Sequence, residues 1–341
     1  MRRRLLMVGA GGFARSWIEG FLPPFLEERV EVAALVDKDP AALDRSGDLL
    51  GLSPDQRFAH MRDAFREVEA DFCAIVIPPA AHRDAVVLAA ERGMHILCEK
   101  PIADTLEATR EIRRAVADSS VKMGVIQNYR FTPRMLTLRH ALRDLDLGAL
   151  NYLVARFAAD YRRYGSWGAA FRHEMPDALL IEGAVHHFDM IRNLAGADCE
   201  LVAGSAWNPS WSSFKGDSSG LFVMHMTNGS HACYEGNCSE AGVSHSWHKE
   251  YYRAECQNGA VVLDAGDAVR VIRDGERTET VAPVPADPNG HHTIIRDFLD
   301  WLDGGPEPET SLSDNVKSMA MVLAAIAAGR QQQVQRVVDY L

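Results

Sequence analysis

Residues 5–14 read LLMVGAGGFA, and this stretch decides the fold of the first part of the chain. An apolar run leads into the pattern G-x-G-x-x-A, formed by Gly9, Gly11 and Ala14. The first glycine permits a tight turn, the second lets a pyrophosphate approach the backbone, and the small third residue lets helix and sheet pack closely. Free N–H groups at the start of the helix favour bound phosphate. A strand, this turn and a helix in direct succession therefore predict a dinucleotide site, which includes Gly12 and Phe13.

A second apolar run, residues 30–36, ends at Asp37. At this distance from the glycine turn, a carboxylate can accept hydrogen bonds from both ribose hydroxyls and repels a 2′-phosphate. Asp37 therefore favours NAD over NADP. The neighbouring Lys38 could balance the extra phosphate, so NADP stays open. The alternative for Asp37 is a simple turn residue ahead of Asp39 and Pro40, which together are typical of a helix start.

Short apolar runs alternate with helical patterns throughout residues 5–126. Such repeated βαβ units predict a doubly wound parallel sheet, the Rossmann type of α/β fold. The expected strands cover residues 5–9, 30–36, 72–77, 95–98 and 122–126. We therefore expect residues 1–126 to form the dinucleotide-binding domain.

The pattern changes after residue 127. Strand-like runs with short turns at Asn228-Gly229, Asn258-Gly259 and Asp274-Gly275 predict an antiparallel meander. The expected helices cover residues 133–143, 178–194, 292–302 and 313–329, and the expected strands cover residues 151–158, 221–226, 231–235, 251–256, 260–263 and 269–272. We therefore expect residues 127–341 to form a second α/β domain.

Length and composition exclude several classes of protein. A chain of 341 residues fits two domains. A net charge of −11 argues against nucleic-acid binding. No apolar run is long enough to span a membrane, and the Arg2-Arg3-Arg4 start is interpreted as leading into a first strand rather than a signal peptide.

Cysteine spacing bears on metals and on the compartment. None of the six cysteines stands in a C-x-x-C pair, so zinc-site spacing is missing and no metal is expected. A reduced, cytoplasmic location is the simplest interpretation. A disulfide between Cys233 and Cys238 stays open.

Several separated motifs then point to one family. Glu99-Lys100-Pro101 follows the fifth expected strand, at the sheet edge where ligands bind in open parallel sheets. The other motifs are GAGGFA, Ile77-Pro78-Pro79 with His82, Asn128-Tyr129-Arg130-Phe131, the segment EGAVHHFD at 182–189, and SLSDNVKSMAMVLAAIAAG near the end. With these motifs the chain resembles the glucose–fructose oxidoreductase/inositol dehydrogenase (Gfo/Idh/MocA) family along nearly its whole length.

The resemblance implies a Rossmann domain followed by an α/β domain with a large, open, mostly antiparallel sheet. It also implies a catalytic set of Lys100, Glu182 and His186, with Glu182 standing where the family commonly has aspartate. Self-association as a homodimer or homotetramer through the second sheet is implied as well. Cofactor contacts are expected from Gly9, Gly11, Gly12, Phe13, Asp37, Lys38, Pro78, His82, Glu99, Lys100 and Asn128.

Chemistry supports the catalytic set. Glu182, His186 and Asp189 share one face of an α-helix at spacings i, i+4 and i+7. Histidine suits the removal of a hydroxyl proton, a nearby carboxylate can orient its ring, and Lys100 can stabilise alkoxide charge. The alternatives for this face are a cation site and a structural hydrogen-bond network. His187 points about 100° away from His186 on the helix and is not expected to share its role.

Residues 161–173 combine aromatic and basic side chains that suit a polyhydroxylated ligand, although a polar loop at a subunit contact is the equal alternative. The expected substrate contacts are Lys100, Arg130, Arg163, Trp167, His173, Glu182, His186 and Asp189. His291 and His292 are interpreted as helix-terminus residues.

We therefore predict an NAD(P)-dependent oxidoreductase that acts on a secondary hydroxyl of a sugar, inositol or related polyol. Two alternatives are an NAD-assisted glycoside hydrolase and a non-catalytic, cofactor-sensing regulator of the same fold.

Overall fold

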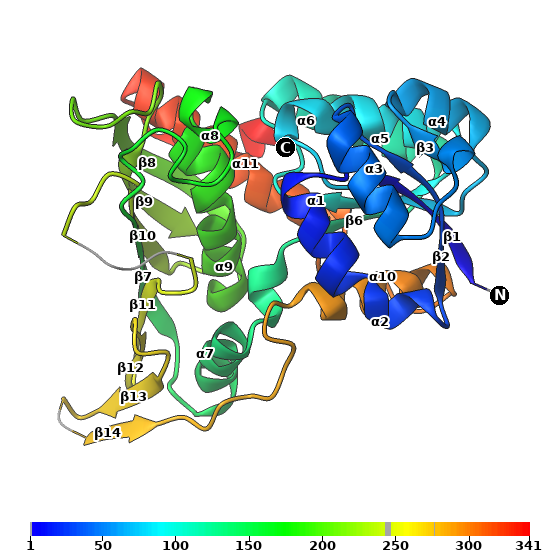
Figure 1. Ribbon diagram of the computed structural model, residues 1–341. Coiled ribbons are helices and arrows are strands. Elements are labelled where there is room, and N and C mark those ends of the chain that lie inside the picture. The colour runs from blue at the N-terminus through cyan, green and yellow to red at the C-terminus, as the bar shows by residue number, and fades with distance from the viewer. Residues whose placement is uncertain (1, 243–246, 276) are drawn as a thin grey trace. The chain divides into compact units, whose positions relative to one another are not determined.

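The computed structural model describes residues 2–242, 247–275 and 277–341 (Figure 1). The chain divides into two compact units, each described here by itself. The first unit contains Met1–Gln127 and His291–Val316, and the second contains Asn128–Gly290 and Lys317–Leu341.

The first unit is built on a six-stranded sheet in the order β3-β2-β1-β4-β5-β6. All neighbouring strands run parallel, which confirms the predicted Rossmann fold. The strands are β1 (Arg3–Val8), β2 (Val30–Val36), β3 (Arg57–Phe58), β4 (Phe72–Ile75), β5 (His95–Glu99) and β6 (Met123–Ile126). The sequence did not predict β3, because two residues are too few to show a period.

Helices connect these strands. They are α1 (Gly12–Ser16), η1 (Trp17–Phe21), α2 (Pro23–Leu26), α3 (Pro40–Leu49), η2 (Pro54–Gln56), α4 (Met61–Glu67), η3 (Pro79–Ala81), α5 (His82–Glu91) and α6 (Leu106–Ser119). Asp39 caps α3 as expected, since its side chain accepts a hydrogen bond from Ala41 N at 3.0 Å. The segment η1 is a π-helical turn, a feature common at functional sites.

The first unit also takes in a segment from late in the chain. Helix α10 (His291–Leu302) packs its apolar face on the parallel sheet, with the Phe298 and Phe72 rings 5.8 Å apart. Lys122 Nζ donates to Trp301 O at 2.5 Å, and Gly124 forms a β-bridge with Ser311. The sequence-based division assigned residues 127–341 to the second domain, because a pattern along one segment does not show which sheet it packs against.

The second unit contains a nine-stranded sheet in the order β14-β13-β12-β11-β7-β10-β9-β8-β15. The strands are β7 (Leu150–Ala158), β8 (Cys199–Trp207), β9 (Ser219–Met226), β10 (His231–Asn237), β11 (Tyr251–Cys256), β12 (Gly259–Leu263), β13 (Val269–Arg273), β14 (Arg277–Thr280) and β15 (Gln335–Arg336). The mostly antiparallel sheet is confirmed. A simple meander is wrong in one place: β7 enters the sheet between β10 and β11 and runs parallel to β10.

Helices cover one face of this second sheet. Helices α7 (Pro133–Asp144) and α9 (Val185–Ala195) lie on the face where Leu153, Ala155 and Phe157 of β7 are buried (Figure 1). The unit also contains η4 (Asn128–Phe131), α8 (Phe171–Glu174), η5 (Leu179–Ala184), η6 (Val337–Tyr340) and most of α11 (Leu312–Gln331). The predicted helix at 178–194 therefore consists of a π-helical turn, η5, followed by α9.

Two further observations concern the whole chain. All six cysteines, each of them among the described residues, are free thiols. In the part of the chain that the structure describes, no helix combines the length and the apolar character that crossing a bilayer requires.

Candidate active site

The glycine turn has the shape that a dinucleotide needs. Gly9 has φ +113°, and a Cβ at this position would lie 2.2 Å from Val76 O, so only glycine fits. Gly11 precedes α1, whose first turn has no side-chain cap and no acidic residue. Ala14 is fully buried beside Gly9. The residues of this turn therefore fit a bound pyrophosphate, because the first turn of α1 presents backbone N–H groups that no side chain caps.

Asp37 holds the glycine turn to the end of β2. Its Oδ2 accepts hydrogen bonds from Ala10 N at 2.7 Å and Gly11 N at 3.1 Å, and its Oδ1 accepts one from Asp39 N at 2.9 Å. A carboxylate offers about four acceptor positions, so one stays available for a ribose hydroxyl. Asp37 thus has the predicted position and also the turn role that was its alternative. Nearby, Lys38 and Phe13 are both exposed.

Lys100 directly follows β5, at the same edge of the sheet as the glycine turn after β1. Glu99 is buried, and both of its oxygens are used within the protein. Oε1 accepts from Trp17 Nε1 at 2.8 Å, and Oε2 accepts from Lys100 N at 3.2 Å. This geometry favours Glu99 as a residue that fixes the backbone of Lys100 over a direct contact with the cofactor.

His291 is one of the residues that sequence reasoning missed. It is buried, stacks on Phe21 with ring centroids 3.9 Å apart, and brings Nε2 within 3.7 Å of Glu99 Oε1. It therefore packs against the elements that carry the predicted cofactor site. A histidine at a helix start gives no sign of this packing in the sequence.

His82 connects two loops at the ligand edge of the sheet. Its Nε2 lies 2.8 Å from Ile77 O and its Nδ1 lies 2.9 Å from Pro101 O, with the ring fully buried. The peptide between Lys100 and Pro101 is cis. His82 thus ties the loop after β4 to the loop that carries Lys100, whereas Pro78 in the first of these loops is exposed.

In the second unit, two predicted substrate contacts bind each other. Arg130 Nε donates to Asp189 Oδ2 at 2.7 Å and Arg130 Nη2 donates to Oδ1 at 2.5 Å. Ser318 Oγ also donates to Asp189 Oδ1, at 2.6 Å. All three side chains are buried, so this network joins η4, α9 and α11. Asn128, predicted as a cofactor contact, donates to Asn289 O at 2.9 Å.

Glu182 is buried in η5 and is paired with a cation that was not among the predicted contacts. Arg172 Nε donates to Glu182 Oε2 at 2.8 Å, and Arg172 Nη1 donates to Trp167 O at 3.0 Å. The guanidinium also lies 5.8 Å from the centre of the Trp167 ring. Arg172 therefore joins the predicted substrate loop to the helix that carries Glu182.

The other residues chosen in this loop have different surroundings. Trp167 is buried and stacks on Tyr161, with ring centroids 5.3 Å apart. His173 is buried too, with Nε2 3.0 Å from Tyr161 O and its ring stacked on Phe214. Arg163 is exposed. Trp167 and His173 thus form part of the packed interior of the loop.

His186 lies in an aromatic cluster. The Tyr129 ring is stacked on its imidazole with 4.4 Å between centroids, and Trp247 approaches edge-on at 5.7 Å. His187 points elsewhere, as expected, with Nδ1 2.9 Å from Tyr234 Oη. Sequence reasoning missed Tyr129 and Trp247 as neighbours of His186. Tyr129 stood in a motif already singled out, but nothing in the sequence connects it to this ring.

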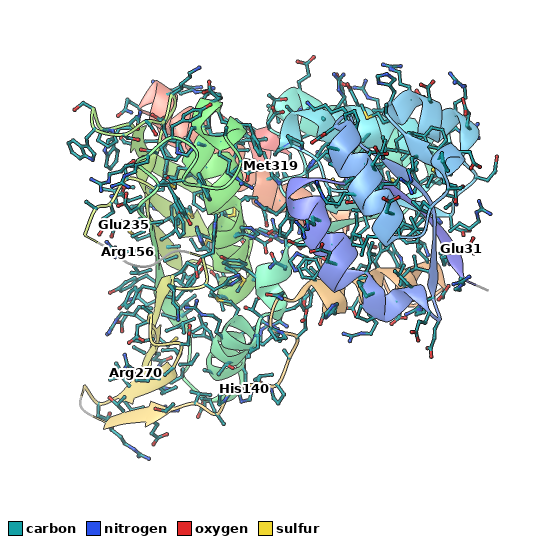
Figure 2. All side chains as sticks on the ribbon, viewed as in Figure 1. Glu31, His140, Arg156, Glu235, Arg270 and Met319 are labelled. Carbon is teal, nitrogen blue, oxygen red and sulfur yellow. The ribbon has the colours of Figure 1, made fainter. Side chains whose placement is uncertain are left out.

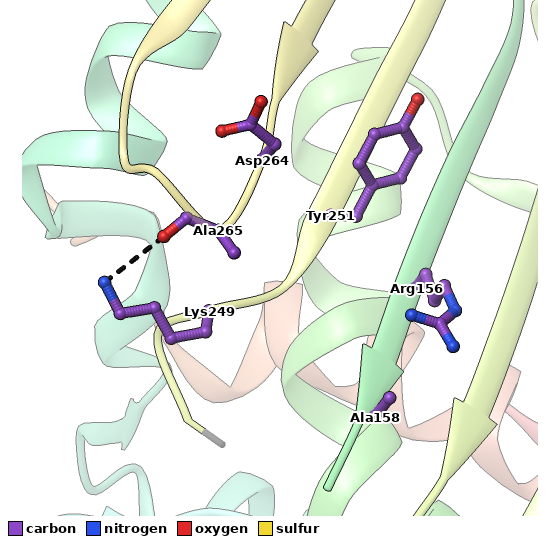
Figure 3. A pocket seen from close by; sticks show the side chains of 6 residues that line it. All are labelled: Arg156, Ala158, Lys249, Tyr251, Asp264 and Ala265. Carbon is purple, nitrogen blue, oxygen red and sulfur yellow. Dashed lines mark hydrogen bonds between the residues drawn. The ribbon is translucent and has the colours of Figure 1, made fainter. Parts of the chain in front are cut away.

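A cavity of about 340 Å³ lies elsewhere in the second unit. It is lined by Arg156, Ala158, Lys249, Tyr251, Asp264 and Ala265, and Lys249 Nζ donates to Ala265 O at 3.4 Å across its rim (Figure 3). None of the residues predicted for the active site lines it. The charged lining is balanced, because Lys249 pairs with Asp267 and Arg156 pairs with Glu235 and Glu240.

The parallel sheet with its glycine turn, together with a second unit built on an open mixed sheet, defines a class of two-part, NAD-binding oxidoreductases. The profile of the family described as "Oxidoreductase family, NAD-binding Rossmann fold" matches residues 3–127. The chain belongs to this Gfo/Idh/MocA family of oxidoreductases.

Relatives match the chain over its whole length. The uncharacterized protein y4oX of Sinorhizobium fredii is 40% identical, covering 100% of this chain and 97% of the relative. A D-apiose dehydrogenase of Paraburkholderia graminis is 26% identical, covering 95% and 87%. A solved oxidoreductase from Agrobacterium radiobacter, in complex with NAD⁺, L-tartaric acid and magnesium, has a TM-score of 0.88 at 19% identity over both whole chains. The last likeness concerns the fold alone.

Proposed function

We propose that the protein is an NAD(P)-dependent dehydrogenase that moves hydride between the nicotinamide and the carbon that bears a secondary hydroxyl of a sugar, inositol or related polyol. The observation that carries the proposal is Lys100, which follows β5 at the carboxyl edge of the sheet, the edge that also holds the glycine turn and Asp37. In open parallel sheets this edge is where ligands bind. The D-apiose dehydrogenase relative supports a sugar as substrate.

The side chains divide the work by their chemistry. The bound nicotinamide cofactor supplies the hydride chemistry. During oxidation, the imidazole of His186 takes the hydroxyl proton, while the Lys100 ammonium stabilises negative charge that develops on the alcohol oxygen. Glu182 already forms an ion pair with Arg172, so we assign it to ligand contact and orientation rather than to proton transfer. Asp37 supports NAD as the preferred cofactor.

Replacing Lys100 tests this function. We expect Lys100→Met to lower kcat for polyol oxidation by at least a thousandfold while the Kd for NADH, measured by fluorescence, changes less than threefold. Lys215→Met is the matched control, because Lys215 is an exposed surface residue. Wild-type turnover retained by Lys100→Met would reject the assignment. Tight NADH binding without turnover on a broad panel of sugars and polyols would instead favour a cofactor-sensing regulator.

We also propose that the protein associates with copies of itself through the face of the second sheet that lies opposite α7 and α9. Leu221 and Val223 of β9 are 50% and 49% exposed on this face, and Tyr152 of β7 is 40% exposed. Arg156 and Glu235, labelled in Figure 2, pair across the same face at 2.8 Å. Exposed apolar side chains that gather on one sheet face are typical of a surface that a partner covers.

Sedimentation velocity tests self-association. We expect the wild type to sediment as a dimer or tetramer and the double variant Leu221→Glu/Val223→Glu to sediment as a monomer. Leu49→Glu, at a leucine of the first unit that is 58% exposed, should leave the mass unchanged. A monomeric wild type would reject this part of the proposal.

A further inference from the structure

Glu250 is a buried carboxylate that no sequence motif singled out. It lies just before β11, is 2% exposed, and accepts hydrogen bonds from η4, from α7 and from its own loop. Tyr129 Oη donates to its Oε1 at 2.8 Å, Arg134 Nη1 donates to its Oε2 at 3.3 Å, and His248 N donates to Oε1 at 3.1 Å. A buried carboxylate with this many donors is fixed in position.

The surroundings keep Glu250 ionised. Burial alone would raise its pKa, but the His187 imidazole, with Nε2 3.6 Å from Oε1, and the Arg134 guanidinium outweigh burial and hold the pKa at about 2. Two more titratable groups face the cluster: Tyr252 from β11 lies near the carboxylate, and Tyr234 from β10 holds the other nitrogen of His187. Asp267 balances part of the Arg134 charge at 3.4 Å.

Tyr129 connects this anion to His186. Its hydroxyl donates to Glu250, while its ring lies nearly parallel to the His186 imidazole, at 18° and 4.4 Å. An aromatic face attracts a cation, and a phenol that donates to a carboxylate is more electron-rich than a free phenol. The stack therefore orients the imidazole and favours its protonated form.

We propose that Glu250 is a positioning residue for His186. By accepting the hydrogen bond from the Tyr129 hydroxyl, it holds the Tyr129 ring against the His186 imidazole. The Tyr129 ring then stabilises the positive charge of the imidazole once the imidazole has taken up a proton. This inference rests on the proposed dehydrogenase function. Glu250 itself need not touch substrate or cofactor, because its effect reaches His186 through Tyr129.

Two variants test the proposal from opposite ends of the hydrogen bond. Tyr129→Phe keeps the stacked ring and removes only the hydroxyl, whereas Glu250→Gln removes the negative charge that accepts this hydrogen bond and pairs with Arg134. We expect each to lower kcat/KM for alcohol oxidation about tenfold and to move the acidic limb of its pH profile to lower pH by about half a unit. The double variant should lose little more than either single one, because both break the same link.

Tyr252→Phe is the matched control. It removes a buried hydroxyl for which the described residues provide no hydrogen-bond partner, so the pH profile should stay where it is. If Glu250→Gln fails to fold, Tyr129→Phe still decides the question. Loss of activity at every pH without a shift of the limb, or additive losses in the double variant, would overturn the proposal.

A measurement without turnover separates this inference from the proposed function. Nuclear magnetic resonance of histidine-labelled protein follows the His186 ring through its titration, with the signal assigned by its loss in His186→Asn. In Tyr129→Phe the midpoint should fall by about half a pH unit even if no polyol is oxidised. An unchanged midpoint would overturn the positioning role, whereas a shifted midpoint in a protein without dehydrogenase activity would reject only the proposed reaction.

Discussion

Arg172 Nε and Glu182 Oε2 lie 2.8 Å apart, and the carboxylate of this pair is buried. Glu182 stands where the family commonly has aspartate, and Arg172 balances its negative charge inside the second unit. Arg172 also donates to Trp167 O, so the ion pair fixes the loop at 161–173 to η5.

Removing one partner of this pair should be costly. We expect Arg172→Met to lower the free energy of unfolding by about 3–5 kcal/mol, because the buried carboxylate of Glu182 would lose its ion pair with Arg172. The double variant Arg172→Met/Glu182→Gln should recover much of this loss. Urea unfolding measures both. The control is Arg162→Met, whose ion pair with Asp160 is on the surface, so its removal should cost far less. If Arg172→Met and Arg162→Met lowered the free energy of unfolding equally, this assignment would be contradicted.

Asp37 should determine cofactor affinity and preference. We expect Asp37→Ser to weaken NADH binding about 10- to 100-fold, the equivalent of one charge-assisted hydrogen bond, and to narrow the preference for NADH over NADPH. Fluorescence titration of both cofactors gives the two Kd values. Asp39→Ser is the control, since serine also caps a helix and keeps the start of α3. If Asp37→Ser left the ratio of the two Kd values unchanged, the ribose contact would have to be abandoned.

Gly9 should tolerate no side chain. Gly9→Ala forces a Cβ to within 2.2 Å of Val76 O at a φ of +113°, so either the end of β4 or the turn must move. We expect a loss of at least about 2 kcal/mol in the free energy of unfolding, together with loss of NADH binding. Gly20→Ala provides the contrast, because a Cβ there meets nothing within 4 Å. Similar unfolding curves for the two variants would show that the turn is more adaptable than its geometry indicates.

The sequence predicted the fold well where a pattern is local. Strands 30–36 and 251–256 match β2 and β11 residue for residue, because Asp37 and the turn at Asn258-Gly259 mark where they end. Pairing between distant segments produces no such local pattern in the sequence. The insertion of β7 beside β10 and the packing of α10 on the first sheet depend on contacts that no single stretch of sequence records.

The site shows the same limit at the level of single residues. Helical spacing grouped charged residues with His186 on one face, but it could not show that Asp189 meets Arg130 and Ser318 instead of solvent or ligand. Glu250 was missed for the same reason, since its importance comes from Tyr129 and His187 on other elements. Motifs name the residues at a site, whereas three-dimensional packing determines which of them remain available to a ligand.

The dependence of stability on pH should show that Glu250 is charged in the folded protein. The pKa of this carboxyl is lowered from 4.5 to about 2 in the folded protein. Its contribution to stability is therefore fully present above about pH 4.5 and is lost as the pH falls toward 2, because the unfolded chain takes up the proton first. At 1.36 kcal/mol per pKa unit, this difference corresponds to on the order of 3 kcal/mol. Urea unfolding at several pH values between 6 and 2.5 measures the slope.

Glu250→Gln should be less stable than the wild type at pH 6 and should lose less stability on acidification, so that the two curves converge near pH 2.5. Glu235→Gln is the control, because Glu235 is a partly exposed carboxylate on the other face of the sheet and its removal should leave the slope nearly unchanged. Parallel curves for the wild type and Glu250→Gln would mean that the carboxyl titrates at its ordinary pH in the folded protein, and that the cluster around it does not hold a charge.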